Sequence, residues 1–375
     1  MPSNYAGVPS NVPAGTISIS EPVDGDPGNA STIQTPEQAL TDAAEYLRQL
    51  IAMAAVANWQ AAAGTAFSAG GIYSLAAGDT QSTDYIVLAV GSSGNTAMSF
   101  NGGQTWPNVT AVGASTYLCA ECMNGMFFAG GVGGQLATGT PSAGVSNLAT
   151  RTSNTTHDIN ALAWNGNAGS PVYVGVGASG DTIRSTDGVT WVKTTVGASD
   201  FKGVAFGAGL FVACSANGHI QTSPDGTTWT DRGAVIGHNA GIAPDSLRYA
   251  AGLFLNVSQS SGGYASWSTD GIAWTEVALG GPSLVSSSGT IAHNGICWLI
   301  IENDAAAYNP PQVLFVSFDG KTWNRRPTSA GSGFLGNTGV FTNTSIGKIT
   351  AARNGVFLTH PVNKTVVALS EAIAA

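Results

Sequence analysis

One short turn sequence recurs along the chain and constrains its fold more than any other feature. Four copies read Ser, any residue, Asp, Gly, two further residues and Trp, and they begin at Ser185, Ser223, Ser268 and Ser317. A fifth copy, which begins at Ser99, is one residue longer and has Asn101 in the Asp position. The closing Trp residues are separated by 85, 38, 45 and 49 residues. Because the longest interval is close to two units of the same period, we expect a degenerate copy near residues 138–143.

The segments between these turns predict several short strands per repeat. Between residues 200 and 232, apolar segments at 202–206 and 210–214 are joined by Ala208-Gly209, and Asn217-Gly218 and Asp225-Gly226 provide the next two turns. The same pattern appears at 161–191, 246–274 and 290–323, and more loosely at 85–106 and 117–150. Repeats of roughly 40–50 residues with several strands are typical of propeller blades rather than helical solenoids.

A seventh set of strand segments, between residues 348 and 369, lacks its closing turn and Trp. We expect the segment around Gly71 to Leu75 to supply the missing strand, because pairing the two ends of the chain leaves few exposed sheet edges. The sequence therefore predicts a mostly-β protein: a seven-bladed β-propeller, with six blades as the alternative, preceded by an extended N-terminal arm and one helix.

The repeated turn resembles the Asp-box, or bacterial neuraminidase repeat, whose usual form is Ser-x-Asp-x-Gly-x-Thr-Trp. The copy at Ser99 fits this form apart from Asn101, and the other four are a shortened variant. The resemblance covers about residues 85 to 323 and implies the propeller fold. In such a turn the Asp side chain accepts backbone N–H groups, Gly takes a positive φ and Trp buries apolar surface. We therefore predict structural roles for Asn101, Trp106, Asp187, Trp191, Asp225, Trp229, Asp270, Trp274, Asp319 and Trp323.

Neuraminidases combine such boxes with a Phe-Arg-Ile-Pro motif, an arginine triad and a Tyr–Glu pair. The sequence has no Phe-Arg-Ile-Pro motif, and its arginines do not follow the triad pattern. A carboxylate repeated once per blade is spread around the ring and cannot form one active site. We therefore predict no catalytic residues and no cofactor, and we interpret the chain as a non-enzyme. A glycan-degrading hydrolase on the same scaffold is the alternative.

The cysteines and histidines do not form a pattern that predicts a metal site. Cys119 and Cys122 have CxxC spacing, but on a strand their side chains point to opposite faces, and no second pair completes a zinc site. The five histidines are scattered singly. We predict that all four cysteines, which are Cys119, Cys122, Cys214 and Cys297, are buried free thiols. We also predict no bound metal.

Charge and hydropathy exclude several classes of partner. Only 9% of the residues are charged and the net charge is −9, without a basic cluster that could contact phosphates. We therefore expect no nucleic-acid partner. No apolar run approaches the length of a membrane span, and Met1 to Tyr5 lacks the basic and apolar regions of a signal peptide. We expect no membrane insertion, and synthesis in a cytoplasm without signal-peptide export.

The first 60 residues differ in character from the rest. Residues 1–34 are rich in Pro and Gly and predict an extended docking arm. Thr35, Pro36 and Gln38 are typical of a helix start, so residues 35–60 predict a helix whose apolar stripe either mediates oligomerisation or packs on the propeller. The propeller is predicted to span residues 61–375.

An arm, a short helix and a low-charge β-rich distal domain resemble the architecture of bacteriophage tail fibres and other virion appendages. This resemblance implies a non-enzymatic virion structural protein that docks on other virion or tail proteins through residues 1–60, forms a homo-oligomer and contacts a glycan or protein on the host surface. A cellular Asp-box scaffold protein unrelated to phage is a further alternative.

The predicted binding residues lie on irregular loops. The second turn at residues 302–311 contains Asn303, Asp304 and Tyr308, and the inter-blade link at residues 231–245 contains His238 and Asn239. Both segments belong to the face opposite the repeated turns, because successive turns of a four-stranded blade alternate between faces. Loops on a rigid scaffold are common recognition sites. An aromatic ring beside amides and carboxylates suits a sugar, which has an apolar face and a rim of hydroxyls.

Overall fold

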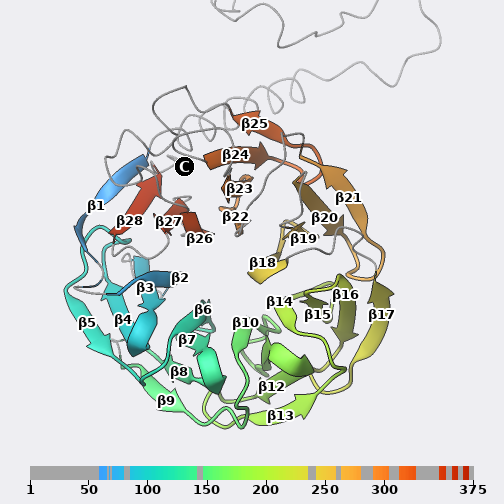
Figure 1. Ribbon diagram of the computed structural model, residues 1–375, viewed down its shortest axis with the longest axis horizontal. Helices are drawn as coiled ribbons and strands as arrows, with labels where there is room; N and C mark the ends of the chain where they lie inside the picture. Colours follow the sequence, from blue (N-terminus) through green and yellow to red (C-terminus); the bar gives the residue numbers. More distant parts are fainter. Residues whose placement is uncertain are drawn as a thin grey trace, which may run out of the picture. The chain divides into compact units, whose positions relative to one another are not determined.

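The strands are arranged as seven four-stranded antiparallel sheets in a ring around a central axis (Figure 1). The computed structural model describes residues 59–65, 67, 70–79, 85–141, 147–234, 242–258, 263–279, 290–303, 312–326, 346–351, 357–361 and 366–370, and the sheet count refers to these residues. All of them belong to one compact unit, Gln49–Ala375. The protein is therefore mostly β and a β-propeller. Within the part described, no helix is long and apolar enough to cross a membrane.

Six of the sheets use four strands that are consecutive in the chain. They comprise β2 (Ile72–Asp79), β3 (Tyr85–Gly91), β4 (Asn95–Ser99) and β5 (Asn108–Ala111); β6 (Tyr117–Met123), β7 (Met126–Gly131), β8 (Leu136–Gly139) and β9 (Ala149–Arg151); β10 (Ile159–Trp164), β11 (Tyr173–Gly177), β12 (Asp181–Ser185) and β13 (Val192–Thr195); β14 (Phe201–Gly207), β15 (Leu210–Ser215), β16 (His219–Ser223) and β17 (Thr230–Ala234); β18 (Ile242–Ala250), β19 (Leu253–Ser258), β20 (Tyr264–Ser268) and β21 (Thr275–Ala278); and β22 (Thr290–His293), β23 (Trp298–Asn303), β24 (Gln312–Ser317) and β25 (Asn324–Arg326). The first strand of each sheet lies nearest the axis and the fourth lies at the rim (Figure 1).

The remaining sheet joins the two ends of the propeller. Strands β26 (Ile346–Ala351), β27 (Phe357–Pro361) and β28 (Val366–Ser370) are completed at the rim by β1 (Trp59–Thr65), which pairs antiparallel with β28. The prediction that the chain ends pair is therefore correct, but the choice of residues 71–75 is wrong. That segment belongs to β2, where Leu75 and Ala76 are buried and the strand pairs with β3 across a local hairpin.

The start of the propeller also differs from the sequence-based boundary. Strand β1 begins at Trp59, two residues before the predicted domain start, so Trp59 and Gln60 are strand rather than helix. The predicted arm at residues 1–34 lies outside the described residues, as does the predicted helix up to residue 58. The connection from β8 to β9 contains residues 140–148, so the expected degenerate copy falls where the other sheets have the repeated turn.

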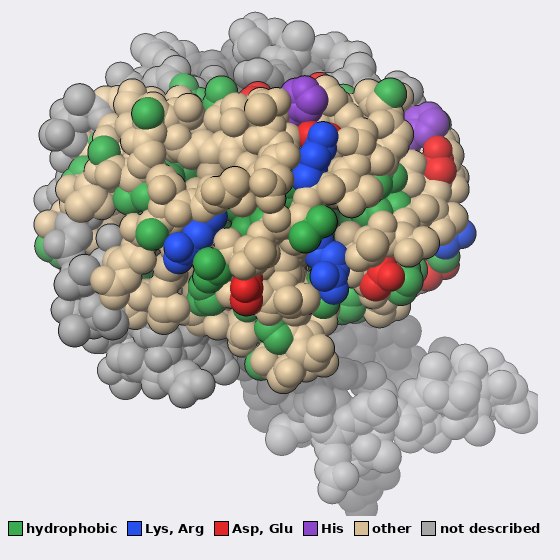
Figure 2. All heavy atoms as spheres, turned by 90° about the horizontal axis from the view of Figure 1, so that it is seen from below, with side chains coloured by type: hydrophobic (Ala, Val, Ile, Leu, Met, Phe, Trp, Pro, Cys, Tyr) green, Lys and Arg blue, Asp and Glu red, His purple; other side chains and the backbone are tan. Residues whose placement is uncertain are grey.

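The hydrophobic core lies between the faces of adjacent sheets rather than at one centre. Apolar clusters combine residues of neighbouring sheets, as where Phe128 of β7 meets Tyr173 of β11 with ring centroids 4.8 Å apart. Each sheet is therefore stabilised mainly by burial against its neighbours. Viewed at right angles to the axis, charged side chains are few on a mostly uncharged surface (Figure 2).

Candidate functional site

Each repeated turn connects the third and fourth strands of its sheet and uses its Ser and Asp inside the turn itself. In the copy that follows β16, Gly226 N donates to Ser223 Oγ at 2.8 Å, and Ser223 Oγ donates to Asp225 Oδ1 at 3.1 Å. The same carboxylate oxygen accepts the N–H groups of Thr227 and Thr228, both at 2.8 Å. The turns at Asp187, Asp270 and Asp319 repeat this arrangement.

These hydrogen bonds favour the ionised carboxylate. The backbone N–H groups of Thr190 and Val189 hold the pKa of Asp187 at about 2. Backbone donors likewise lower the pKa of Asp225 and of Asp270. Asn101 accepts Thr105 N at 2.9 Å in the longer copy, so a neutral amide can take the same place. A carboxylate held ionised by its own turn is poorly suited to act as a general acid.

The repeated turns also hold neighbouring sheets together, which the sequence did not reveal. Gly226 has φ +73°, and a β-carbon placed there would lie 2.6 Å from Val174 Cγ2 on β11 of the preceding sheet. Arg184 Nε, on β12 of that same sheet, donates to Asp225 O at 2.9 Å. Glycine is therefore required both for its backbone conformation and for this close approach.

The Trp residues of the turns differ in burial. Trp106 and Trp191 are buried, whereas Trp229, Trp274 and Trp323 are half-buried. The indole N–H of Trp229 donates to Gly226 O and that of Trp274 to Gly271 O, each at 3.3 Å. The expectation that each Trp covers apolar surface therefore holds fully only for the first two.

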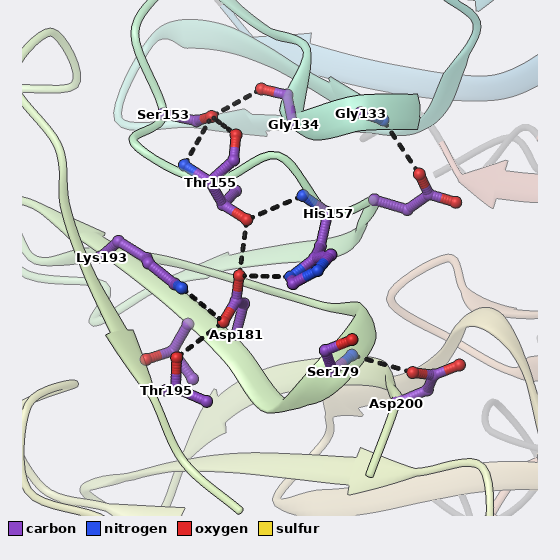
Figure 3. Close-up of polar contacts among 12 residues, drawn as sticks. Gly133, Gly134, Ser153, Thr155, His157, Ser179, Asp181, Lys193, Thr195 and Asp200 are labelled. Carbon is purple, nitrogen blue, oxygen red and sulfur yellow. Dashed lines mark hydrogen bonds and ion pairs between the residues drawn. The ribbon is translucent and has the colours of Figure 1, made fainter. Parts of the chain in front are cut away.

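A second polar cluster surrounds Asp181, the first residue of β12 (Figure 3). Its carboxylate is 3% exposed and lies 3.0 Å from Lys193 Nζ on β13. Thr155 Oγ1 donates at 2.6 Å and His157 Nδ1 lies at 3.0 Å, both from the link that precedes β10, while Thr195 Oγ1 donates at 2.8 Å. Burial alone would raise the pKa of Asp181, but these donors lower it to about 2. The Asp181 carboxylate therefore connects the link that precedes β10 with β12 and β13, and its contacts are structural.

Two further aspartates bind the bends between second and third strands. Asp158 Oδ1 accepts Gly133 N at 2.9 Å, and Asp200 Oδ1 accepts Ser179 N at 2.8 Å (Figure 3). Each aspartate belongs to the link that leads into the next sheet. Asp158 and Asp200 thus fix neighbouring sheets to one another.

A cavity of about 260 Å³ lies among the innermost strands and is a candidate ligand site. Its lining comes from β6, β10, β14 and β18, with Gly166 of the turn after β10. Met123, Trp164, Phe206 and Tyr249 lie where these inner strands turn into the second strands. We call this cavity the axial pocket. It lies toward the face that carries the repeated turns, because antiparallel neighbours place both kinds of turn on one side.

The charged residues at the axial pocket form an ion cluster across the axis. Glu121 of β6 contacts Arg248 Nη2 of β18 at 3.2 Å and Lys348 Nζ of β26 at 3.4 Å, both through Oε1. Lys348 is 8% exposed and also donates to Ala120 O at 3.2 Å. These three strands belong to three different sheets, and no two of these sheets are neighbours in the ring. Only Glu121 and Arg248 of the three line the pocket.

Three aromatic side chains occupy equivalent places in successive sheets around the pocket. Trp164, Phe206 and Tyr249 each pair across the first hairpin with an aromatic residue of the second strand: Tyr173, Phe211 and Phe254. The ring centroids of these pairs are 6.4, 4.7 and 4.6 Å apart, respectively. We call the three inner rings the aromatic collar. The sequence signal that could have found it is an aromatic residue before the first turn of consecutive repeats.

The loop residues that the sequence predicted for binding are mostly outside the described residues. Asn303 ends β23, where its backbone pairs with Gln312. Asp304, Tyr308, His238 and Asn239 lie outside the described part of the chain. The structure therefore brings together a different set at the axial pocket. Sequence reasoning missed it because Glu121, Arg248 and Lys348 of the ion cluster are scattered over more than 200 positions.

The four cysteines are free thiols, but they are not all buried. Cys119, Cys214 and Cys297 are buried, and burial raises the pKa of each to about 12. Cys122 is half-buried and lines the axial pocket, so the prediction of burial is wrong for it. Its side chain packs toward Gly78, where only a glycine leaves room. Among the residues described, no group of His, Cys, Asp and Glu could hold a metal ion.

Comparisons with known proteins identify the fold alone. No family model and no curated protein matches the sequence. Among solved structures, the WD40 repeats of RRP9 are similar with a TM-score of 0.61 at 10% identity, and U3-55K with 0.60 at 9%. YCF48 from Cyanidioschyzon merolae is similar with a TM-score of 0.56 at 14% identity. Each match covers 84% of this chain and 98% of the other. The structural similarity supports a propeller fold, but at identities this low it says nothing about function.

Proposed function

We propose that this chain is a non-enzymatic, seven-bladed Asp-box propeller that serves as a virion structural protein of the tail-fibre or appendage type. In this proposal the N-terminal segment docks on other virion or tail proteins, and the propeller contacts a glycan or protein of the host surface. The chain is made in the host cytoplasm and is located in the virion.

The observation that carries the non-enzymatic part is the use of each box carboxylate within its own turn. Asp187, Asp225 and Asp270 accept backbone N–H groups and have a lowered pKa, so they favour the ionised state. The axial pocket supports the same conclusion. Hydrolysis of a glycosidic bond normally uses two carboxyl groups about 5 to 9.5 Å apart. The described lining of the pocket contains one, Glu121.

The appendage part rests on the layout of the sequence. A Pro- and Gly-rich segment precedes a propeller in which only 9% of all residues are charged. Such a segment can dock on a particle while the rigid ring remains available for recognition. The same layout supports assembly as a homo-oligomer, since appendages are usually built from several copies.

Mass spectrometry of purified virions from the source of this chain tests the proposal. We expect peptides of the chain in a fixed ratio to the other tail proteins after density-gradient purification. A chain that stays in the soluble fraction of the lysate contradicts a virion role. A release of reducing ends from host polysaccharide by the purified protein contradicts the non-enzymatic assignment and favours the hydrolase.

A further inference from the structure

We propose that the axial pocket binds one neutral pyranose residue, with its ring against the aromatic collar and its hydroxyl groups on Glu121 and Arg248. The proposal concerns the purified propeller and holds whether or not the chain is part of a virion. It places a ligand site on the side of the repeated turns.

The charged side chains of the pocket suit a ligand that both donates and accepts hydrogen bonds. The described lining carries one cation and one carboxylate, Arg248 and Glu121, in contact at 3.2 Å. Among the described residues, both ion contacts of Glu121 use Oε1, and no hydrogen bond reaches Oε2. Glu121 is 27% exposed and Arg248 is 21% exposed, so both reach the pocket. A hydroxyl group can donate to the carboxylate and accept from the guanidinium, which matches the rim of a sugar ring.

The aromatic collar supplies the apolar face that a sugar ring needs. Trp164, Phe206 and Tyr249 are half-buried, so each leaves part of its ring accessible. Tyr173 stacks on Trp164 with an interplanar angle of 17°. Phe211 contacts Phe206 edge-on at 61°, and Phe254 is tilted by 53° against Tyr249. A backed ring loses little further freedom when a ligand binds to it. One face of a pyranose carries C–H groups, which pack on such a ring.

The size of the pocket limits the ligand to a single sugar residue. Its volume of about 260 Å³ is slightly below the range of roughly 300–1,000 Å³ that is typical of sites for drug-sized molecules. A longer glycan can therefore place one residue in the pocket while its remaining residues lie outside. The pocket would then bind a terminal residue or a side branch of a surface polysaccharide.

Isothermal titration calorimetry on the full chain tests the proposal. The probes are the methyl glycosides of glucose, galactose and mannose, with N-acetylglucosamine, and glucuronic acid and glycine serve as charged comparisons. We expect saturable binding of at least one neutral sugar with a dissociation constant on the order of 1 mM. We expect Trp164→Ala and Arg248→Ala to weaken it at least about tenfold, a loss that corresponds to about 1.4 kcal/mol.

Matched variants control for unfolding and for location. Trp267→Ala removes a Trp of β20 that lies under Lys321 outside the pocket lining, and it should leave binding unchanged. Circular dichroism reports whether each variant folds, and Tyr249→Leu replaces Trp164→Ala if the latter does not. Absence of binding by every neutral probe overturns the proposal, as does binding of glucuronic acid or glycine alone. Binding that survives all pocket variants places the sugar elsewhere and also overturns it.

Discussion

Replacing Asp181 by Asn tests whether the carboxylates of the propeller stabilise its links. The carboxylate is 3% exposed and contacts Lys193 Nζ at 3.0 Å, with donors from Thr155, His157 and Thr195. Those donors lower its pKa from 3.8 to about 2. Such a difference between unfolded and folded states corresponds to about 2 kcal/mol of stability at neutral pH. Asn keeps the shape but loses the charge, so we expect a loss of about 2 kcal/mol.

The pH dependence of the same group gives an independent check. Because the folded pKa of Asp181 is lower than its unfolded value, its stabilisation is present above about pH 4 and is lost as the pH falls toward 2. The wild-type protein should therefore lose its advantage over Asp181→Asn on acidification. The difference in free energy of unfolding between the two proteins should shrink over this window.

Urea denaturation followed by tryptophan fluorescence and circular dichroism measures these differences. The midpoint should fall while the slope of the transition stays constant. The control is Asp231→Asn, because Asp231 is 58% exposed and lies 3.7 Å from His219. A loss below about 0.5 kcal/mol at Asp181, or an equal loss at Asp231, would refute the argument, because surface ion pairs contribute only about 0–1 kcal/mol.

Four other changes have definite expected outcomes. Asp225→Ala should lower stability by about 1 kcal/mol, because its two backbone donors are exposed and water can replace the lost acceptor; a larger loss in urea denaturation would mean that these donors are buried. Gly226→Ala should cost more, about 2 kcal/mol, since it strains a residue at φ +73° and places a β-carbon 2.6 Å from Val174; equal losses for the two variants would contradict the close approach. Deletion of residues 1–58, which spares β1, should leave a folded ring by circular dichroism that no longer joins virions, and normal incorporation would remove the docking role from this segment. The combined variant Asn303→Ala, Asp304→Ala, Tyr308→Ala should fold normally and adsorb poorly to host cells in a binding assay, and unchanged adsorption would move the host contact to another surface.

The sequence predicted the ring because its periodicity is local. Each repeated turn contains its own acceptor, its glycine and its Trp within seven or eight residues. The complete turn motif can therefore be recognised in a short stretch of sequence. The hairpins around Asn217-Gly218 and Asp225-Gly226 are equally local, and β14 to β17 lie where their apolar segments indicate. The closing strand was misplaced because pairing of β1 with β28 joins residues about 300 positions apart and has no local signal.

The axial pocket could not be predicted for a related reason. Glu121, Arg248 and Lys348 meet only because three inner strands of distant sheets face one axis. Which face of an inner strand points to the axis depends on how the whole ring closes, and a shift of one residue would reverse it. The aromatic collar is different because it has a local sequence signal. Phe206 and Tyr249 each lie three residues before a Gly-Leu-Phe sequence in their repeats. Comparing repeats at that position would have indicated it.

We propose that the propeller binds a surface glycan and does not cleave it. To test this, the purified full chain is incubated with surface polysaccharide from the host. The retention of the protein on the polysaccharide and the release of reducing ends are then measured in the same sample. We expect saturable retention, no increase in reducing ends over hours, and retention that falls when Trp164 is replaced by Ala. Reducing ends that increase linearly with protein concentration would contradict it.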